Sequence, residues 1–332
     1  MTESLLTVDD LHVVFPMPQG VVHAVNGITL EIKKSQIYGI VGESGCGKTA
    51  TGRAILQLVP PPGKITGGRI RFREQDLLTM GTHEMRLLRG RRIAMVFQDP
   101  SAALNPVFTI GQQLLMIMKR HKIAYENGRR QRAIQLLGEL GLPAPRDIMN
   151  RYPHELSGGM QQRAMIAMAL SAEPDLIIAD EPTSALDVTI QSQILDLLVR
   201  LRDQRGVTII LITHDLGVVA ETCDEVAVFY MGEIVERGTT REIFHNTGHP
   251  YTQQLLEALP NPKSWGRDLK VIPGSVPTNF DPMQGCPFES RCSSRVPVCK
   301  TEKPRIIELS HTHQAVCHLY QGAAVKGGGG PV

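Results

Sequence analysis

The stretch GESGCGKT, from Gly42 to Thr49, constrains the fold of this chain more than any other part of its sequence. It matches the pattern G-x-x-x-x-G-K-[ST], and it stands between the apolar run IYGIV and the helical run ATGRAILQL. Glycines let backbone N–H groups turn inward around phosphate oxygens, while the lysine reaches the outer phosphates and the hydroxyl binds Mg²⁺. The pattern therefore predicts a loop that holds the phosphates of a nucleotide, between a strand and a helix of an α/β fold.

The residues of this loop that we predict to bind the nucleotide are Gly42, Ser44, Gly45, Cys46, Gly47, Lys48 and Thr49. Thr49 is also a predicted Mg²⁺ ligand. Cys46 is small enough to serve as a filler, which is the simpler interpretation, although a thiol at the start of a helix could be reactive. A glycine-rich turn without a ligand is the alternative for the whole motif, and the strand and helix around it favour the nucleotide site.

The stretch LIIADE, residues 176–181, predicts the second half of a nucleotide site. An apolar strand would deliver Asp180 to its polar end, where the carboxylate can hold Mg²⁺, and Glu181 would polarise the attacking water. An isolated Asp-Glu pair is more often part of a solvated loop, but here it accompanies the phosphate loop. His214 follows another buried run; such a histidine is usually structural, yet the end of a strand in this type of fold faces the ligand crevice.

Short apolar runs alternate with helical patterns along most of the chain, which predicts a mainly parallel α/β sheet. Residues 5–40 differ, because their β-branched residues recur with period two and predict an antiparallel β element packed on that core. Residues 105–160 have a helical pattern and predict an inserted helical subdomain.

The composition changes after residue 258, where a proline-rich stretch precedes a short segment with cysteines and no clear periodicity. We therefore expect two domains, at 1–258 and 259–332, with the second a small Cys-rich module. The final GGGGPV is predicted to be a flexible tail.

Composition and charge narrow the classes of function. Charged residues make up 20% of the 332 residues and the formal net charge is +2, which is not the basic excess of a nucleic-acid binder. The start MTESLLTVDD has no basic stretch followed by an apolar run, and no segment approaches the roughly 18 apolar residues of a spanning helix. We expect a chain that is neither exported nor embedded in a membrane, has no nucleic-acid partner, and keeps its thiols in a reducing cytosol.

The motif LSGGMQQR decides the class of protein. Ser157, Gly158 and Gly159 stand at the start of a helical run, so that a hydroxyl, N–H groups and the helix dipole form a second anion site. One chain has little use for two separate phosphate sites, the loop at 42–49 and this one. Two chains do, if the second site of each chain closes on the nucleotide bound by the other. The motif resembles the signature of ATP-binding cassette (ABC) ATPases, as do Gln98 in VFQDP and the SALD loop at 184–187.

This resemblance implies an ABC-type P-loop ATPase over residues 1 to about 258, with ATP and Mg²⁺ bound. Phe15 aligns with the aromatic residue that stacks on adenine, although a plain apolar strand residue is the alternative. Glu181 would be the general base, and Gln98 would sense the metal and the attacking water. His214 would contact the γ-phosphate.

The resemblance also assigns the remaining binding residues. Thr49, Gln98 and Asp180 would be the Mg²⁺ ligands. Ser157 to Gly159 would bind the γ-phosphate held by the opposite chain. All the residues of the motifs are present, so we expect a chain that hydrolyses ATP.

Three classes of ABC protein use this cassette: transporters, DNA-maintenance ATPases and translation-type ATPases. The second normally carries a very long coiled coil inside the cassette and the third usually carries two cassettes, whereas this chain has one uninterrupted cassette. The stretch FQDPSAALNPVFTIG is similar to the importer loop that receives a coupling helix from a membrane subunit. The sequence therefore favours transport.

The C-terminal half narrows the subfamily. The stretch GEIVERGTTREIFHNTGHPYTQQLLEALP, followed by PGSVP and cysteines, resembles the ATPases of oligopeptide and dipeptide permeases. That resemblance implies uptake of di- or oligopeptides by a complex with a second related ATPase subunit, two transmembrane permease subunits and an extracytoplasmic substrate-binding protein. The chain would lie on the cytoplasmic face of the inner membrane as a peripheral protein. A nickel or other small-solute importer is the alternative, and we assign the HPYT stretch no catalytic role.

Four of the six cysteines, Cys286, Cys292, Cys299 and Cys317, follow the spacing C-x5-C-x6-C-x17-C. Zinc sites usually contain tighter pairs of cysteines, whereas this spacing permits four thiolates around a [4Fe–4S] cluster. Permease ATPases with this tail resemble cluster binders, so we expect a cluster. Zinc, with help from the nearby His311, His313 or His318, and a small module of packed cysteines are the alternatives; the fifth cysteine, Cys223, is expected to be packed.

Overall fold

The structure is a computed structural model that describes residues 3–123, 126–184, 186–259, 272, 274–278, 280 and 284–320. They are divided between two units, each assembled from separate parts of the chain. Unit 1 consists of Met1–Leu5, Ile32–Ile37 and Phe72–Ile212. Unit 2 consists of Leu6–Glu31, Tyr38–Arg71 and Thr213–Val332. Most of the proline-rich stretch after residue 259, Ala185 of the SALD loop and the GGGGPV end lie outside the described residues.

Continuous apolar runs form the sheet of unit 1. The strands β6 (Ile93–Val96), β7 (Leu176–Asp180) and β8 (Thr208–Thr213) run parallel, with β7 in the middle. Every residue of β7 and β8 is buried, because a parallel strand is covered on both faces. The register pairs Asp180 with Ile212, so that the carboxyl end of β7 lies beside the end of β8.

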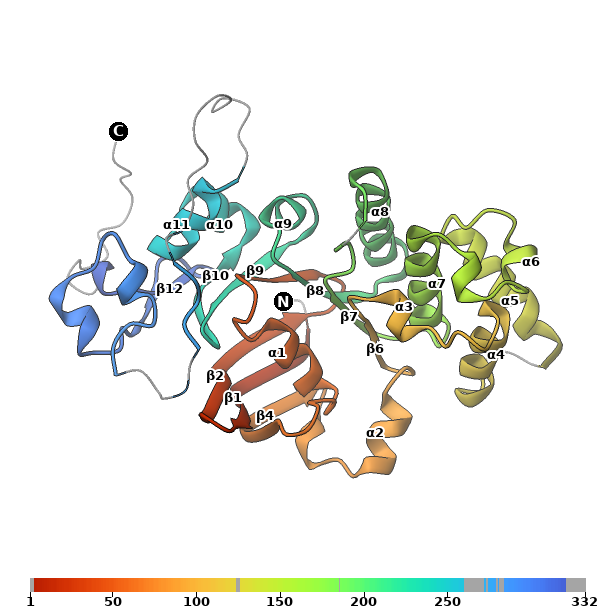
Figure 1. Ribbon diagram of the computed structural model, residues 1–332, viewed down its shortest axis with the longest axis horizontal. Helices are drawn as coiled ribbons and strands as arrows, with labels where there is room; N and C mark the ends of the chain where they lie inside the picture. Colours follow the sequence, from red (N-terminus) through yellow and green to blue (C-terminus); the bar gives the residue numbers. More distant parts are fainter. Residues whose placement is uncertain are drawn as a thin grey trace. The chain divides into compact units, whose positions relative to one another are not determined.

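Helices make up most of the rest of unit 1. They are α2 (Thr82–Leu88), α3 (Pro100–Ala103), α4 (Ile110–Arg120), α5 (Glu126–Glu139), α6 (Pro145–Ile148), α7 (Gly158–Leu170) and α8 (Val188–Arg205), with the short β5 (Gln75–Asp76), η1 (Leu77–Thr79) and η2 (Pro153–Glu155) between them. Figure 1 shows α4 to α7 gathered into one helical group, in yellow to green. Thr109 begins this group, because its hydroxyl accepts from the backbone N–H of Gln112 while the Gln112 side chain accepts from the backbone N–H of Thr109.

Unit 2 contains two sheets. The first has the strand order β2 (Gly20–Lys33), β1 (Ser4–Met17), β4 (Lys64–Phe72). The second has the order β11 (Ile306–Glu308), β12 (Gln314–Val316), β10 (Glu233–Thr239), β9 (Glu225–Tyr230), β3 (Ile37–Val41). The β3 and β9 strands are parallel, and the pairs from β9 to β11 are antiparallel.

Helical segments complete unit 2. They are α1 (Lys48–Ile55), α9 (Leu216–Thr222), α10 (Thr240–His245), α11 (Pro250–Glu257), η4 (Glu289–Arg291), η5 (Pro297–Lys300) and η6 (His318–Tyr320). His249 begins α11 by accepting a hydrogen bond from the N–H of Tyr251 on its Nδ1, 3.1 Å away. Pro250 follows at the first helical position, where a missing N–H costs nothing.

Residues 284–320, the C-terminal segment, continue the second sheet of unit 2. Strand β12 pairs with β10 through Glu236 opposite Ala315 and Arg237 opposite Gln314. The expectation of a separate Cys-rich module is therefore not confirmed. Strand β12 of the C-terminal segment instead pairs with β10 and so extends the sheet beyond it. Figure 1 shows β12 beside β10.

The C-terminal segment also shares an aromatic core with the rest of unit 2. Phe288, Tyr230 and Tyr251 are fully buried, and the Phe288 ring centre lies 5.2 Å from each of the two tyrosine rings. Burial of three aromatic side chains in contact stabilises this junction by several kcal/mol, at roughly 1.5–3 kcal/mol for each large apolar side chain. The segment is therefore held by packing as well as by strand pairing.

Candidate functional site

Two glycines hold the loop between β3 and α1 in a backbone conformation that excludes other residues. Gly47 has a φ of 101°, and a Cβ there would lie 2.2 Å from the carbonyl oxygen of Ala24. Gly42 has a φ of 149°, and a Cβ there would lie 2.2 Å from the carbonyl oxygen of Phe229. The loop thus needs glycine at both positions, and its N–H groups lead into the start of α1, which is an arrangement that binds phosphate.

Lys48 lies inside the curve of this loop. Its Nζ donates to the carbonyl oxygens of Gly42, at 2.7 Å, and Glu43, at 3.0 Å, and the residue is only 5% exposed. A buried ammonium group held by neutral carbonyl oxygens gains a stronger, charge-assisted bond when a phosphate is offered. Ser44 and Gly45 are exposed, and Thr49 is half-buried in the first turn of α1.

Cys46 is a packed residue of the loop. It is fully buried, and burial raises the pKa of its thiol, with Lys48 acting in the opposite direction. A thiol with a raised pKa stays protonated and is a poor nucleophile. The structure thus favours the filler interpretation over the reactive one.

Glu43 is a residue of the loop to which sequence analysis assigned no role. Its carboxylate forms two hydrogen bonds with the guanidinium group of Arg291, at 2.7 and 3.0 Å. Its N–H donates to the hydroxyl of Tyr251, at 3.0 Å. Tyr251 belongs to the HPYT stretch, which the sequence singled out without indicating that it meets the loop.

Phe15 lies near the end of β1 and is half-buried. Its ring packs so closely on Gly63 that a Cβ there would lie 2.5 Å from the ring. The described contacts neither confirm nor contradict its predicted stacking on adenine, which stays a prediction.

Gln98, Asp180 and Glu181 meet in unit 1. Asp180 ends β7 and is 2% exposed. Glu181 follows with a φ of 47°, a left-handed conformation that costs a non-glycine residue about 1 kcal/mol or more. Its N–H donates to the carbonyl oxygen of Ile212 at 2.8 Å, and its Oε2 accepts from Gln98 Nε2 at 3.2 Å. The structure therefore brings the predicted base and the predicted glutamine sensor into contact.

The signature residues Ser157, Gly158 and Gly159 form the start of α7. The Ser157 hydroxyl accepts from the N–H of Met160 at 3.4 Å, and both Ser157 and Gly158 are exposed. A Cβ on Gly159 would lie 2.8 Å from the Ile190 side chain, so close packing on α8 requires a glycine. An exposed helix start with small residues suits contact with a phosphate on another chain.

His214 directly follows β8 and is exposed. It belongs to unit 2, as do the phosphate loop and Phe15, whereas Gln98, Glu181 and the signature residues belong to unit 1. The role predicted for His214 stays a prediction.

The four C-terminal cysteines are free, and the other three affect the pKa of Cys286. Cys286, Cys299 and Cys317 are each 7% exposed, and Cys292 is half-buried. Burial first, and then the charges of the other three cysteines, raise the pKa of Cys286 to about 12, although the N–H of Phe288 opposes the shift. Burial also raises the pKa of Cys292 and Cys317.

These cysteines do not form a metal-ion site in the structure. In the described part of the chain, no group of three or more His, Cys, Asp or Glu residues is arranged to hold a metal ion. The expected [4Fe–4S] cluster is therefore not confirmed. The histidines have other partners: His313 Nε2 lies 2.7 Å from Glu236 Oε1, and His318 Nε2 lies 2.8 Å from the carbonyl oxygen of Glu302. His313 is buried, and its partner Glu236 is buried as well.

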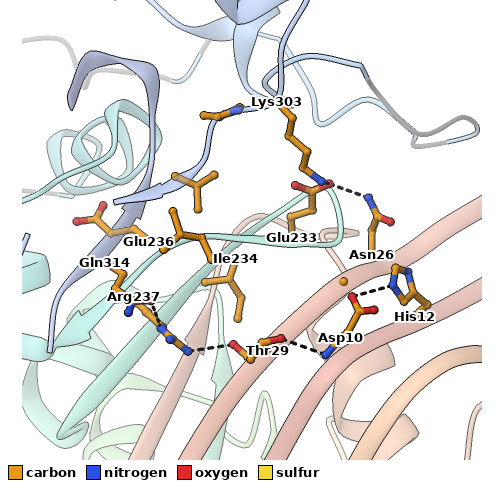
Figure 2. Close-up of a pocket in the computed structure, with 14 residues that line it drawn as sticks. Asp10, His12, Asn26, Thr29, Glu233, Ile234, Glu236, Arg237, Lys303 and Gln314 are labelled. Carbon is orange, nitrogen blue, oxygen red and sulfur yellow. Dashed lines mark hydrogen bonds and ion pairs between the residues drawn. The ribbon is translucent and has the colours of Figure 1, made fainter. Parts of the chain in front are cut away.

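A pocket of about 440 Å³ lies in unit 2, where β1, β2 and β10 meet the C-terminal segment. Figure 2 shows that the Glu233 carboxylate accepts hydrogen bonds from Lys303 and Asn26. At another side of the pocket, the ring of His12 meets the carboxylate of Asp10. None of its lining residues is one of the predicted ATP residues. The pocket therefore carries none of the chemistry described above.

Among the residues that the structure describes, no helix combines the length and the apolar character needed to cross a membrane.

Two family models match the chain. One, described as ABC transporter, matches residues 25–184. The other, described as the C-terminal region of oligopeptide/dipeptide transporters, matches residues 235–299. The two matches thus cover the phosphate loop and signature motif on one side, and three of the four C-terminal cysteines on the other.

Several curated proteins are similar over nearly their whole length. The dipeptide transport ATP-binding protein DppD of Bacillus subtilis (strain 168) is 46% identical over 318 residues, which cover 96% of this chain and 95% of the relative. DppD of Escherichia coli (strain K12) is 44% identical, with 95% and 96% covered. The oligopeptide transport ATP-binding protein OppD of Bacillus subtilis (strain 168) is 45% identical, with 97% and 90% covered.

Solved structures resemble a smaller part of the chain. The ATP-binding cassette MJ0796, in a dimeric post-hydrolysis state bound to ADP and Pi, has a TM-score of 0.64 and 28% identity, and covers 71% of this chain and 99% of that one. CbiO1 from Clostridium perfringens, part of the transporter complex cbiONQ, has a TM-score of 0.62 and 28% identity, with 74% and 92% covered.

Proposed function

This chain belongs to the ATP-binding subunits of dipeptide and oligopeptide ABC importers, and from that premise we propose which of its residues bind ATP, hydrolyse it and meet its partners. It is an ATPase of the ABC type, with ATP as its substrate and Mg²⁺ as the expected metal. Its hydrolysis of ATP drives peptide import through membrane permease subunits. We propose that the exact peptide is selected by other subunits of the importer.

The phosphate loop binds the triphosphate of ATP. The glycines at 42 and 47 leave room for phosphate oxygens beside the backbone, and Lys48 exchanges its two carbonyl partners for phosphate oxygens. Phe15 stacks on the adenine. Oxygen donors suit Mg²⁺, and the Thr49 hydroxyl, the Gln98 side-chain oxygen and the buried Asp180 carboxylate would hold it. Mg²⁺ supplies neutralisation of phosphate charge.

Glu181 is the general base, and the hydrogen bond from Gln98 to its carboxylate is the observation that carries this assignment. The carboxylate accepts a proton from a water molecule while the water oxygen forms a bond to the γ-phosphorus. The bond between the γ-phosphorus and the bridging oxygen breaks, and ADP leaves with the electron pair. Gln98 orients the carboxylate and the water, and His214 contacts the γ-phosphate.

Replacing Glu181 by Gln tests this mechanism. We expect ATP to bind as before, while hydrolysis by the assembled importer falls by about 100-fold or more, the usual contribution of a positioned base. Glu173→Gln is the matched control, because Glu173 also has a left-handed backbone, with a φ of 55°, but no predicted role. Turnover at the wild-type rate in Glu181→Gln would show that another group is the base.

The signature residues close on the nucleotide of a second, related ATPase chain. Ser157 and Gly158 are exposed at the start of α7, as a contact with another chain requires. The complete importer would hold this heterodimer beneath two permease subunits, fed by an extracytoplasmic substrate-binding protein. The chain would then lie at the cytoplasmic face of the inner membrane as a peripheral protein.

The segment after Gln98 receives the permease. Apolar side chains are exposed along it, with Val107 at 70%, Phe108 at 38% and Met116 at 48%. Exposed apolar side chains that gather on one short segment are typical of a contact with another protein. ATP-driven pairing of the two cassettes would move this segment and so the permease.

We also propose the four C-terminal cysteines as ligands of a [4Fe–4S] cluster in the functional protein, although the described residues are not arranged as a metal-ion site. The support is the burial of Cys286, Cys299 and Cys317, together with the pKa of Cys286, which burial raises first and the charges of the other three cysteines raise further. Four thiolates are the usual ligands of such a cluster. The cluster would supply a structural crosslink among the short loops of the C-terminal segment. Iron and sulfide analysis of anaerobically purified protein tests this: about four irons per chain would support it, and one zinc or no metal would refute it.

A further inference from the structure

Glu43, at the start of the phosphate loop, is held at three of its groups. Its carboxylate binds Arg291, its N–H donates to Tyr251, and its carbonyl oxygen accepts from Lys48 at 3.0 Å. Two of these partners come from the last third of the chain. The position of the loop is thus set partly by residues that take no part in binding phosphate.

The pair between Arg291 and Glu43 has the geometry of a fixed clasp. Both guanidinium nitrogens donate to separate carboxylate oxygens, and the Arg291 side chain is 6% exposed. Its guanidinium group also lies 5.7 Å above the Tyr230 ring centre, and the bond to Glu43 raises the pKa of Arg291. A planar fork in a buried setting keeps one orientation, unlike an exposed lysine pair.

The clasp is built on the cysteine-bearing segment. Arg291 ends η4, next to Cys292, and Phe288 precedes that helix. The Phe288 ring packs on Tyr251, with 5.2 Å between ring centres, and the backbone N–H of Phe288 lowers the pKa of Cys286, against the larger effect of burial. Both anchors of Glu43 thus depend on how the segment around Cys286 and Cys292 is folded.

We propose that Arg291 and Tyr251 are positioning residues for the phosphate loop, through which the C-terminal cysteine segment sets the affinity of the loop for ATP. The proposal rests on the proposed function of Gly42–Thr49 as the phosphate site. Neither residue touches the reacting atoms in this scheme. Loss of the clasp therefore weakens ATP binding and leaves the chemical step intact.

The test uses the full chain and calorimetric titration with ATP and Mg²⁺. We expect Arg291→Gln and Glu43→Gln each to raise the Kd for ATP about tenfold, within the usual range of coupling between sites. The double variant should resemble either single variant, because both remove one interaction. Arg291→Lys, which keeps the charge without the fork, should lie between wild type and Arg291→Gln.

Two control variants distinguish an error in the proposed phosphate site from an error in the proposed positioning role. Arg295→Gln removes a more exposed arginine of the same segment, 58% exposed and 3.8 Å from Glu289, and should leave the Kd unchanged. Lys48→Ala should abolish ATP binding. If Lys48→Ala binds ATP normally, the proposed phosphate site is wrong; if it does not bind, while Arg291→Gln and Glu43→Gln bind like wild type, the positioning role alone is overturned.

Kinetics of the assembled importer distinguish positioning from a merely structural role. We expect KM for ATP to rise about tenfold in Arg291→Gln, with kcat within about twofold of wild type. A lower Tm with unchanged KM, or effects of the two single variants that simply add in the double variant, would overturn the proposal.

Discussion

His249 is a buried histidine that folds in its neutral form. It is 2% exposed, its ring Nδ1 accepts from the backbone N–H of Tyr251, and its backbone N–H donates to Glu236 Oε2 at 3.0 Å. Burial lowers the pKa of its ring from 6.5 to about 3. Protonation would remove the cap of α11 and place a second charge in the interior.

This pKa predicts that acid weakens the fold. Between pH 6.5 and pH 3 the unfolded chain binds a proton at His249 that the folded chain does not, so stability is complete above pH 6.5 and falls as the pH drops. At pH 5 the loss is about 2 kcal/mol relative to pH 7. Urea unfolding of wild type and His249→Asn at both pH values measures it, since asparagine keeps a cap acceptor and does not titrate there. Equal losses in the two proteins would contradict the assignment.

Two glycines of the phosphate loop, Gly45 and Gly47, differ in the space available for a side chain. Gly45 and Gly47 both have positive φ, at 83° and 101°, but a Cβ on Gly45 meets nothing within 4 Å, whereas one on Gly47 meets the carbonyl oxygen of Ala24. We expect Gly45→Ala to cost about 1–2 kcal/mol of backbone strain. Gly47→Ala should cost clearly more and abolish ATP binding, because the loop must move. Thermal unfolding and ATP titration of both variants check this, and equal behaviour would count against the loop geometry.

At the scale of elements, the pairing of β12 with β10 covers a strand edge that would otherwise be exposed. Strand β12 covers the backbone groups of β10, and its neighbour His313 meets the buried carboxylate of Glu236. An uncovered strand edge is a template for aggregation, and a buried carboxylate without its partner is strongly destabilising.

A chain that ends at Ala258 should therefore be poorly soluble and less stable, by about 3 kcal/mol for the lost partner of Glu236 alone. A chain that ends at Tyr320 keeps every described contact and should match wild type. Light scattering and thermal unfolding of the two truncated chains provide the measurement. A monodisperse short chain with an unchanged Tm would mean that β10 needs no cover.

At the scale of the whole molecule, the proposed attachment to the membrane would depend on partners. No described helix can span a bilayer, and the formal net charge of +2 gives little attraction to an acidic surface. The exposed Val107 and Phe108 are the proposed contact with the permease.

We expect the chain to sediment with membranes only when the permease subunits are expressed with it. Val107→Asp should release at least about tenfold more protein into the supernatant, since a buried apolar contact becomes a charge. Leu319→Asp, which changes a side chain that is 46% exposed on the C-terminal segment, is the control. Sedimentation without the permease would place the attachment elsewhere.

Much of this molecule could be predicted because its motifs are local. The run GESGCGKT fixes its own loop, and the apolar runs of β7 and β8 read as buried parallel strands since every residue is covered. The predicted base and glutamine, Glu181 and Gln98, also prove to be in contact. Each of these features depends on neighbours in sequence or on strand order that the pattern implies.

The contacts that sequence could not predict join distant residues without a motif of their own. Arg291 meets Glu43 across 248 residues, and His313 meets Glu236 across 77. Nothing in the spacing of the cysteines indicates that β12 completes the sheet at β10. Such pairs follow from packing of the whole chain, and a single sequence carries no periodicity that reports them.

The clasp between Arg291 and Glu43 also orders events during synthesis. Glu43 leaves the ribosome 248 residues before Arg291, and Tyr251 follows it by 208. Synthesis proceeds at roughly 5–20 residues per second, so Arg291 is made on the order of 10 to 50 seconds after Glu43. A nascent chain therefore lacks the clasp until Arg291 has been made, and a chain interrupted before that residue should bind ATP more weakly than the complete one.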